Sequence, residues 1–242
     1  MNTKGKTSTR KSNTKITPST LMRLGGVSAM IAGLCFIVIG MFHPVNIPSS
    51  VTTATWVNVH IFATALGFFG LFGMAGLYAR QAEKSGWLGL IGFILFTVWM
   101  TLASGFSLVE AFILPRLVTA SPAFVAGFLG MFSGAPSEID LGILPTLWNL
   151  SGPMYIFGPL LFGIATFRAG VLPRWAGALL VLGALLVPVS ALVPAEYQPR
   201  IMVPVGLAIA WLGYALFSER REKALEALLN QRTAKPEASQ VA

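Results

Sequence analysis

The chain has 242 residues, of which 55% are hydrophobic and 11% are charged, and its formal net charge is +8. Because soluble domains carry about a quarter charged residues, this composition excludes an ordinary water-soluble domain. The positive charge lies in the tails and short loops instead of on one face of a domain, which argues against nucleic acid as a partner. A lipid bilayer fits the composition, and we predict an all-α, polytopic membrane helix bundle.

The first twenty residues are rich in Lys, Thr, Ser and Asn and contain almost no apolar side chains. We predict that residues 1–20 form a disordered, basic cytoplasmic tail that lies near anionic lipid headgroups. The apolar run that follows is longer than the core of a signal peptide, and no clean A-x-A cleavage site comes after it. We therefore expect this run to stay in place as the first membrane span.

Six apolar runs between residues 21 and 217 are long enough to cross about 30 Å of hydrocarbon as helices. The breaks between them contain Pro or Gly, and most contain charge, as is typical of short connections. The predicted transmembrane domain, 21–217, therefore has six transmembrane helices, at 21–43, 57–79, 87–109, 143–167, 173–194 and 200–217.

The connection between the third and fourth spans, 110–142, is too long for a simple turn. Its centre, 117–132, is apolar but only sixteen residues long, and it contains Pro122 near its start. That length favours a short interfacial or re-entrant helix over a seventh crossing.

Beyond the last span, residues 218–242 begin with a sequence of high helix propensity. We predict a cytoplasmic helix there, followed by a disordered tail.

The basic residues predict how the bundle is oriented. With six spans and both termini on one side, fifteen Lys and Arg residues lie on that side, and only Arg116 and Arg200 lie opposite. Such an excess marks the cytoplasmic face, so we predict that both termini are cytoplasmic.

Three ionisable side chains are predicted to lie at the opposite, outer end of the bundle. His43 ends the first span, His60 begins the second, and Glu110 ends the third, so their heights along the bundle are similar. Two imidazoles and a carboxylate are the ligand set of many catalytic zinc sites. The pattern therefore gives a hypothesis of a metal site, with Zn²⁺ as the metal, to which Glu138 and Asp140 in the following loop could contribute.

A simpler interpretation of the same residues stays open. His43 precedes Pro44, where the helix must end, and its imidazole can meet exposed carbonyl groups and water there. His60 lies in the first turns of the next span, and Glu110 could pair with Arg116. No HExxH, HxxxH or CxxC motif is present to fix a metal geometry, and no sequence pattern identifies a catalytic residue or a nucleotide cofactor site.

Three functional classes follow. Spans two to six contain almost no ionisable residue near the middle of the membrane, which favours a non-enzymatic scaffold, sensor or accessory bundle. A metal-dependent membrane enzyme at the outer surface is the alternative that depends on His43, His60 and Glu110. A small transporter is the third class, because Pro153 and Pro159, with neighbouring glycines, could break the fourth span.

Several segments carry a resemblance to known sequences: HP at 43–44, WVNVH at 56–60, GLYARQAE at 76–83, VEAFILP at 109–115 and LLFGIATFRAGVLPRWAGALL at 160–180. In these segments the chain resembles a group of uncharacterised bacterial multi-pass integral membrane proteins. The resemblance covers most of residues 21–217 and neither tail. It implies an all-helical bundle in the cytoplasmic (inner) membrane of a bacterium, and it implies no activity.

Overall fold

The computed structural model describes residues 16–233, with side chains described through residue 219. The predicted disordered segments, apart from a few residues next to the first helix, lie outside this range. The described residues form helices and connecting turns, with no strand among them. The α-helices are α1 (Pro18–Phe42), α2 (Ala54–Phe112), α3 (Leu114–Ala120), α4 (Pro122–Gly130), α5 (Leu144–Ala169), α6 (Arg174–Leu186) and α7 (Met202–Thr233). Short 3₁₀ helices lie at η1 (Pro48–Ser50), η2 (Met131–Ser133), η3 (Pro188–Leu192) and η4 (Gln198–Ile201).

Local signals in the sequence fix both ends of α1. The side chain of Thr17 accepts a hydrogen bond from the backbone N–H of Thr20, and Pro18 occupies the first turn, where its missing N–H costs nothing. The helix therefore begins three residues before the predicted boundary. It ends at Phe42, because His43 is followed by Pro44 and adopts an extended conformation.

Helix α2 is a hairpin of two helical runs that reverse direction at Gly86. This glycine has φ 55° and ψ −154°, a backbone conformation that residues with a side chain rarely adopt. The runs 54–85 and 87–112 pack against each other without space for a side chain, because a Cβ at Gly67 would lie 2.6 Å from Ser104 Oγ. Each run exceeds the roughly twenty residues that a span needs.

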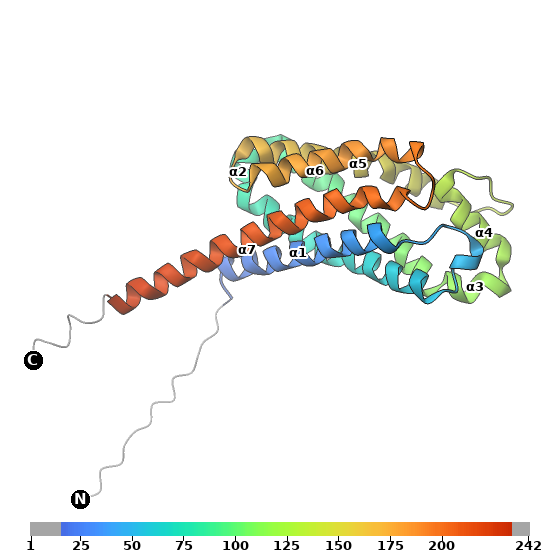
Figure 1. Ribbon diagram of the computed structural model, residues 1–242, viewed down its shortest axis with the longest axis horizontal. Helices are drawn as coiled ribbons and strands as arrows, with labels where there is room; N and C mark the ends of the chain where they lie inside the picture. Colours follow the sequence, from blue (N-terminus) through green and yellow to red (C-terminus); the bar gives the residue numbers. More distant parts are fainter. Residues whose placement is uncertain (1–15, 234–242) are drawn as a thin grey trace, which may run out of the picture.

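The long helical runs surround a common core in a closed ring (Figure 1). Helix α1 packs between α7 and the first run of α2, while α5 packs between the second run of α2 and α6, and α6 in turn contacts α7. Glycines allow the closest approaches. A Cβ on Gly33 would lie 2.5 Å from the carbonyl oxygen of Gly206 in α7, and Gly26 and Gly40 face α7 in the same way. Such contacts let the backbones of α1 and α7 nearly touch.

Helix α6 is shorter than the predicted span at 173–194. It ends at Leu186 after 13 residues, about 20 Å, and the chain continues through η3. Pro188 explains the difference, since it lacks the N–H that the next helical turn requires. The segment from Val187 to Ile201 therefore crosses the end of the bundle as irregular chain and short 3₁₀ turns.

The region 117–132, predicted to contain one short helix, contains parts of two helices instead. Two helices, α3 and α4, occupy this region, and they meet at Ser121, whose φ of −148° and ψ of 68° are not helical. Together with η2 they cover one end of the bundle (Figure 1). They contribute to a second apolar cluster there, in which Trp56, Phe106 and Phe128 are almost fully buried.

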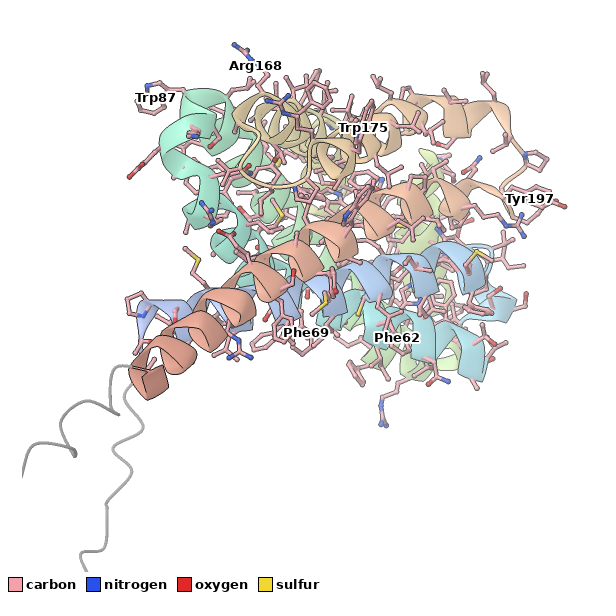
Figure 2. All side chains as sticks on the ribbon, turned by 60° about the vertical axis from the view of Figure 1, so that its left-hand side comes forward. Phe62, Phe69, Trp87, Arg168, Trp175 and Tyr197 are labelled. Carbon is pink, nitrogen blue, oxygen red and sulfur yellow. The ribbon has the colours of Figure 1, made fainter. Side chains whose placement is uncertain are left out.

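Length and composition support membrane insertion. Within the described part of the chain, α1, α2, α5 and the segment from Gln198 to Glu219 are long and apolar enough to cross a membrane. Trp87 and Arg168 lie at one end of the bundle and Tyr197 at the other (Figure 2), with Trp87 78% exposed. Trp, Tyr and Arg at the two ends of an apolar bundle are typical of proteins that sit in a bilayer.

Candidate functional site

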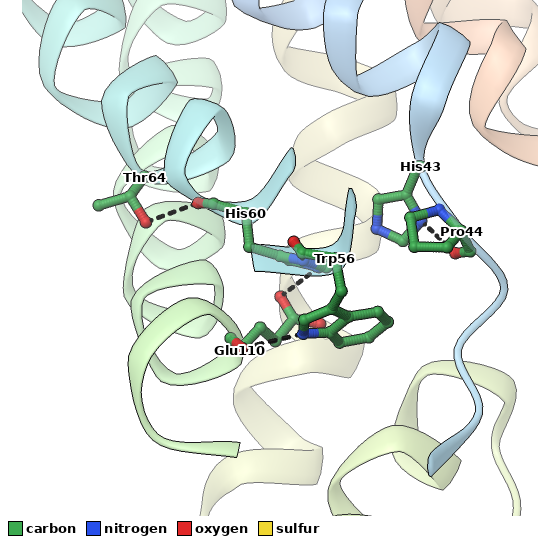
Figure 3. A network of polar contacts seen from close by, with 6 residues as sticks. All are labelled: His43, Pro44, Trp56, His60, Thr64 and Glu110. Atoms are coloured by element: carbon green, nitrogen blue, oxygen red, sulfur yellow. Dashed lines mark hydrogen bonds and ion pairs between the residues drawn. The ribbon is translucent and has the colours of Figure 1, made fainter. Parts of the chain in front are cut away.

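The structure brings His43, His60 and Glu110 close together (Figure 3). His43 is the residue that caps the end of α1, His60 lies in the second turn of α2, and Glu110 lies near the end of the same helix. The reversal at Gly86 places the beginning and the end of α2 side by side, which explains how residues fifty positions apart meet. His60 and Glu110 are buried, with 1% and 5% of their surfaces exposed.

Backbone carbonyl groups determine the tautomer of both imidazoles. His60 Nδ1 donates to the carbonyl oxygen of Trp56 over 2.7 Å, and His43 Nδ1 donates to that of Pro44, also over 2.7 Å. Since a carbonyl oxygen can only accept, Nδ1 carries the proton in each ring. When these histidines are neutral, each Nε2 therefore presents a lone pair.

The lone-pair side of His60 faces the Glu110 carboxylate. His60 Nε2 lies 3.3 Å from Glu110 Oε2, yet Nε2 makes no hydrogen bond within the described structure. The His43 ring stands edge-on to the His60 ring with their centroids 5.0 Å apart. Three groups that accept hydrogen bonds or bind cations are thus gathered in one place.

Trp56 supports this arrangement from one side. Its indole Nε1 donates to the backbone carbonyl of Glu110 over 2.9 Å, and its ring packs on that of His60 with centroids 4.2 Å apart. Trp56 is completely buried. It holds the two ends of α2 together and fixes the orientation of His60.

A cavity of about 380 Å³ adjoins these residues, which is within the range of small-molecule sites. Its polar end is formed by His43, His60 and Glu110, and its walls come from α1, both runs of α2, α5 and the segment from Val187 to Met202. Trp99, eleven residues before Glu110, also lines it, so it extends about 16 Å along α2. Among the described residues that line the cavity, Glu110 is the one with a carboxyl group, and no Lys or Arg accompanies it.

Aromatic side chains form much of the cavity wall, and none of them was predicted to belong to a site. Trp99 stacks on Tyr155 with a centroid distance of 4.1 Å, and Phe132 meets Trp148 edge-on at 4.6 Å. The hydroxyl of Tyr155 is buried and has no hydrogen-bond partner among the described groups.

The spacing of these lining residues along the sequence could have predicted this wall. On each of two helices, the residues that line the cavity are spaced at i, i+3, i+4 and i+7, which places them on one face of that helix. On α2 these are Ala103, Phe106, Ser107 and Glu110, and on α5 they are Trp148, Ser151, Gly152 and Tyr155.

Other predicted partners of the site do not join it. Glu138 and Asp140 are exposed in the loop before α5, and Asp140 Oδ1 accepts a hydrogen bond from the backbone N–H of Gly142 over 2.7 Å. The alternative pairing of Glu110 with Arg116 is not among the ion pairs of the described residues. Glu110 faces His60 instead.

The nitrogen and oxygen atoms at this site are of the types that bind zinc, but only two of them are placed as ligands of one ion. Two ligands of one tetrahedral Zn²⁺, with bonds of about 2.0–2.1 Å, lie roughly 3.3 Å apart, which matches His60 Nε2 and Glu110 Oε2. The carbonyl bonded to each Nδ1 is the usual support for a histidine that binds metal through Nε2. However, no group of three or more His, Cys, Asp or Glu residues in the described range is placed so that it could hold a metal ion.

Comparisons with known proteins match no family model, no curated protein and no solved structure.

Proposed function

We propose that this protein is an integral membrane protein that binds a small, mainly apolar molecule in the cavity next to Glu110, as a sensor or accessory protein and without catalysis. The observation that carries this proposal is the cavity of about 380 Å³, whose wall is largely aromatic and aliphatic. Ligand sites typically combine such walls with a few polar groups at one end. A scaffold that only packs against partners would have no use for this space.

In this proposal the six long helical runs are six spans of a bacterial cytoplasmic membrane, and both termini lie in the cytoplasm. The two runs of α2, joined at Gly86, supply two of the spans, and α6 with η3 supplies the fifth. The distribution of Lys and Arg supports this orientation, and the basic tails lie near anionic lipid headgroups. The cavity then opens at the outer half of the membrane, with α3 and α4 at the interface.

The transporter hypothesis loses the feature on which it depended. Helix α5 is continuous from Leu144 to Ala169, with Pro153 and Pro159 inside it, so the fourth span is not broken. A continuous helix offers no unwound backbone groups for a substrate in the middle of the membrane.

Binding is tested on the purified protein in lipid nanodiscs, with 2-phenylethanol and 2-phenylethylamine as probes and ligand-observed NMR as the readout. Saturable binding above that of empty nanodiscs is expected. The variant Ala103→Phe fills the cavity and should abolish binding. Leu108→Phe places the same ring five residues along α2 on the exposed face and should leave binding unchanged. The proposal fails if neither probe binds, or if the two variants behave alike.

A metal-dependent function is the second candidate, and the separation of 3.3 Å between His60 Nε2 and Glu110 Oε2 favours it. His43 would have to turn its Nε2 toward the pair to provide a third ligand. The metal content of the purified protein tests this: about one zinc per chain is expected in the wild type and in Glu138→Gln, and none in Glu110→Gln. A wild-type protein purified in Zn²⁺ that carries none contradicts it.

A further inference from the structure

The polar end of the cavity contains a carboxyl group that no Lys or Arg of the described lining accompanies. Glu110 is buried, with 5% of its surface exposed, and the described residues that line the cavity bring no Lys or Arg to it. The nearest side chain, His60, uses its Nδ1 proton for the carbonyl oxygen of Trp56 and presents Nε2. Burying a carboxylate without a cation is costly, so a cation at this position would stabilise the site.

His60 Nε2 and Glu110 Oε2 lie within ion-pair distance, but no short hydrogen bond joins them. An imidazolium beside a carboxylate normally forms a short, charge-assisted hydrogen bond of about 2.7–2.9 Å. Here the two atoms are 3.3 Å apart, and Nε2 makes no hydrogen bond within the described structure. The two side chains are therefore not fixed to each other by a hydrogen bond, and the His43 ring lies close by.

The rest of the cavity indicates which cation fits. Trp99, Phe106, Trp148 and Tyr155 are among the residues that line the cavity. Aromatic faces attract organic cations, and their area accommodates an apolar body. A metal ion alone would leave most of a volume of about 380 Å³ unused.

On the basis of the proposed binding function, we infer that the ligand of this cavity is a small amphipathic amine, whose ammonium group binds Glu110 and His60 and whose apolar body packs on the aromatic wall. The ammonium donates to Glu110 Oε2 and to His60 Nε2, which satisfies both acceptors at once. An alcohol of the same shape has one donor and no charge, and a carboxylic acid is repelled as its anion.

Three probes with similar apolar bodies separate these cases: 2-phenylethylamine, 2-phenylethanol and 3-phenylpropionate. The protein in nanodiscs is first dialysed against a chelator so that no metal competes at Glu110, and binding is measured by ligand-observed NMR. Because hydrogen bonds to a buried charge are stronger than neutral ones, the amine should bind about tenfold or more tightly than the alcohol. The acid should not bind.

Two carboxylate-to-amide variants provide the control. In Glu110→Gln the preference for the amine should disappear while the alcohol still binds. In Glu138→Gln, which removes an equal charge from the exposed outer loop, the preference should remain. Equal binding of amine and alcohol to the wild type overturns this inference and leaves the proposed binding function intact. Failure of all three probes to bind overturns both. The wild-type comparison decides the question even if Glu110→Gln does not fold.

Discussion

Trp56 and Glu110 are joined by a hydrogen bond of 2.9 Å from the indole Nε1 to the backbone carbonyl oxygen, across 54 residues of sequence. This bond closes the open end of the α2 hairpin, opposite the turn at Gly86. It also fixes the carboxylate of Glu110 beside His60, because the Trp56 carbonyl orients the His60 ring from the other side. The geometry of the polar end thus depends on a residue that does not itself line the cavity.

Replacing Trp56 with Phe should lower the free energy of unfolding by about 1–3 kcal/mol, because the buried carbonyl of Glu110 loses its partner. Thermal unfolding in detergent provides the measurement. Trp87→Phe is the matched control, since Trp87 is 78% exposed and should tolerate the same change without loss. Equal melting temperatures for the two variants would show that the hydrogen bond contributes nothing.

The protonation of His60 can be tested through stability. If the pair consists of two facing acceptors, Glu110→Gln should keep or raise the melting temperature, because the new amide can donate to His60 Nε2. Glu110→Ala should lower it, because the side chain leaves a gap. A fall in Glu110→Gln as large as that in Glu110→Ala would indicate that His60 is protonated and forms an ion pair with Glu110, and that the two groups are not facing acceptors.

The contact between α1 and α7 should be sensitive to a single methyl group. A Cβ on Gly33 would lie 2.5 Å from the carbonyl oxygen of Gly206, so Gly33→Ala must push two backbones apart, at a cost of about 1–3 kcal/mol. Gly105→Ala adds the same methyl where no other atom lies within 4 Å. Chemical unfolding should separate the two variants clearly, and a similar stability for both would contradict this packing.

The orientation of the bundle is testable with single cysteines. Cys35 is the one cysteine in the sequence and is buried, so Cys35→Ala gives a suitable background. A membrane-impermeant maleimide should label Glu138→Cys in intact cells, and Lys84→Cys only after the cells are permeabilised. Both positions are exposed in the structure. Labelling of Lys84→Cys from outside would show that the orientation is wrong.

The sequence predicted much of the helical framework because short-range signals determine it. Pro44 ends α1, Gly86 turns the α2 hairpin and Gly170 ends α5 with a left-handed conformation, each through its own backbone restriction. The similar heights of His43, His60 and Glu110 followed from the lengths of the helices alone. The early end of α6 was missed because its apolar composition continues past Pro188.

The cavity could not be predicted in the same way, because it depends on how helices pack. Gly67 and Ser104 set how closely the two runs of α2 approach, and that approach brings His60 to within 3.3 Å of Glu110. The aromatic wall needs α2 and α5 to face each other, as in the stacking of Trp99 on Tyr155. Composition and hydropathy carry no information about these distances.

Protection of a thiol placed inside the cavity is the most direct test of the binding site. In the Cys35→Ala background, Ala103→Cys lines the cavity, whereas Leu108→Cys faces away from it on the same helix. Saturating 2-phenylethylamine or 2-phenylethanol should slow the reaction of Ala103→Cys with N-ethylmaleimide several-fold and leave that of Leu108→Cys unchanged. If neither compound slows the modification of Ala103→Cys, the cavity does not hold a small molecule, and the proposed binding function is contradicted.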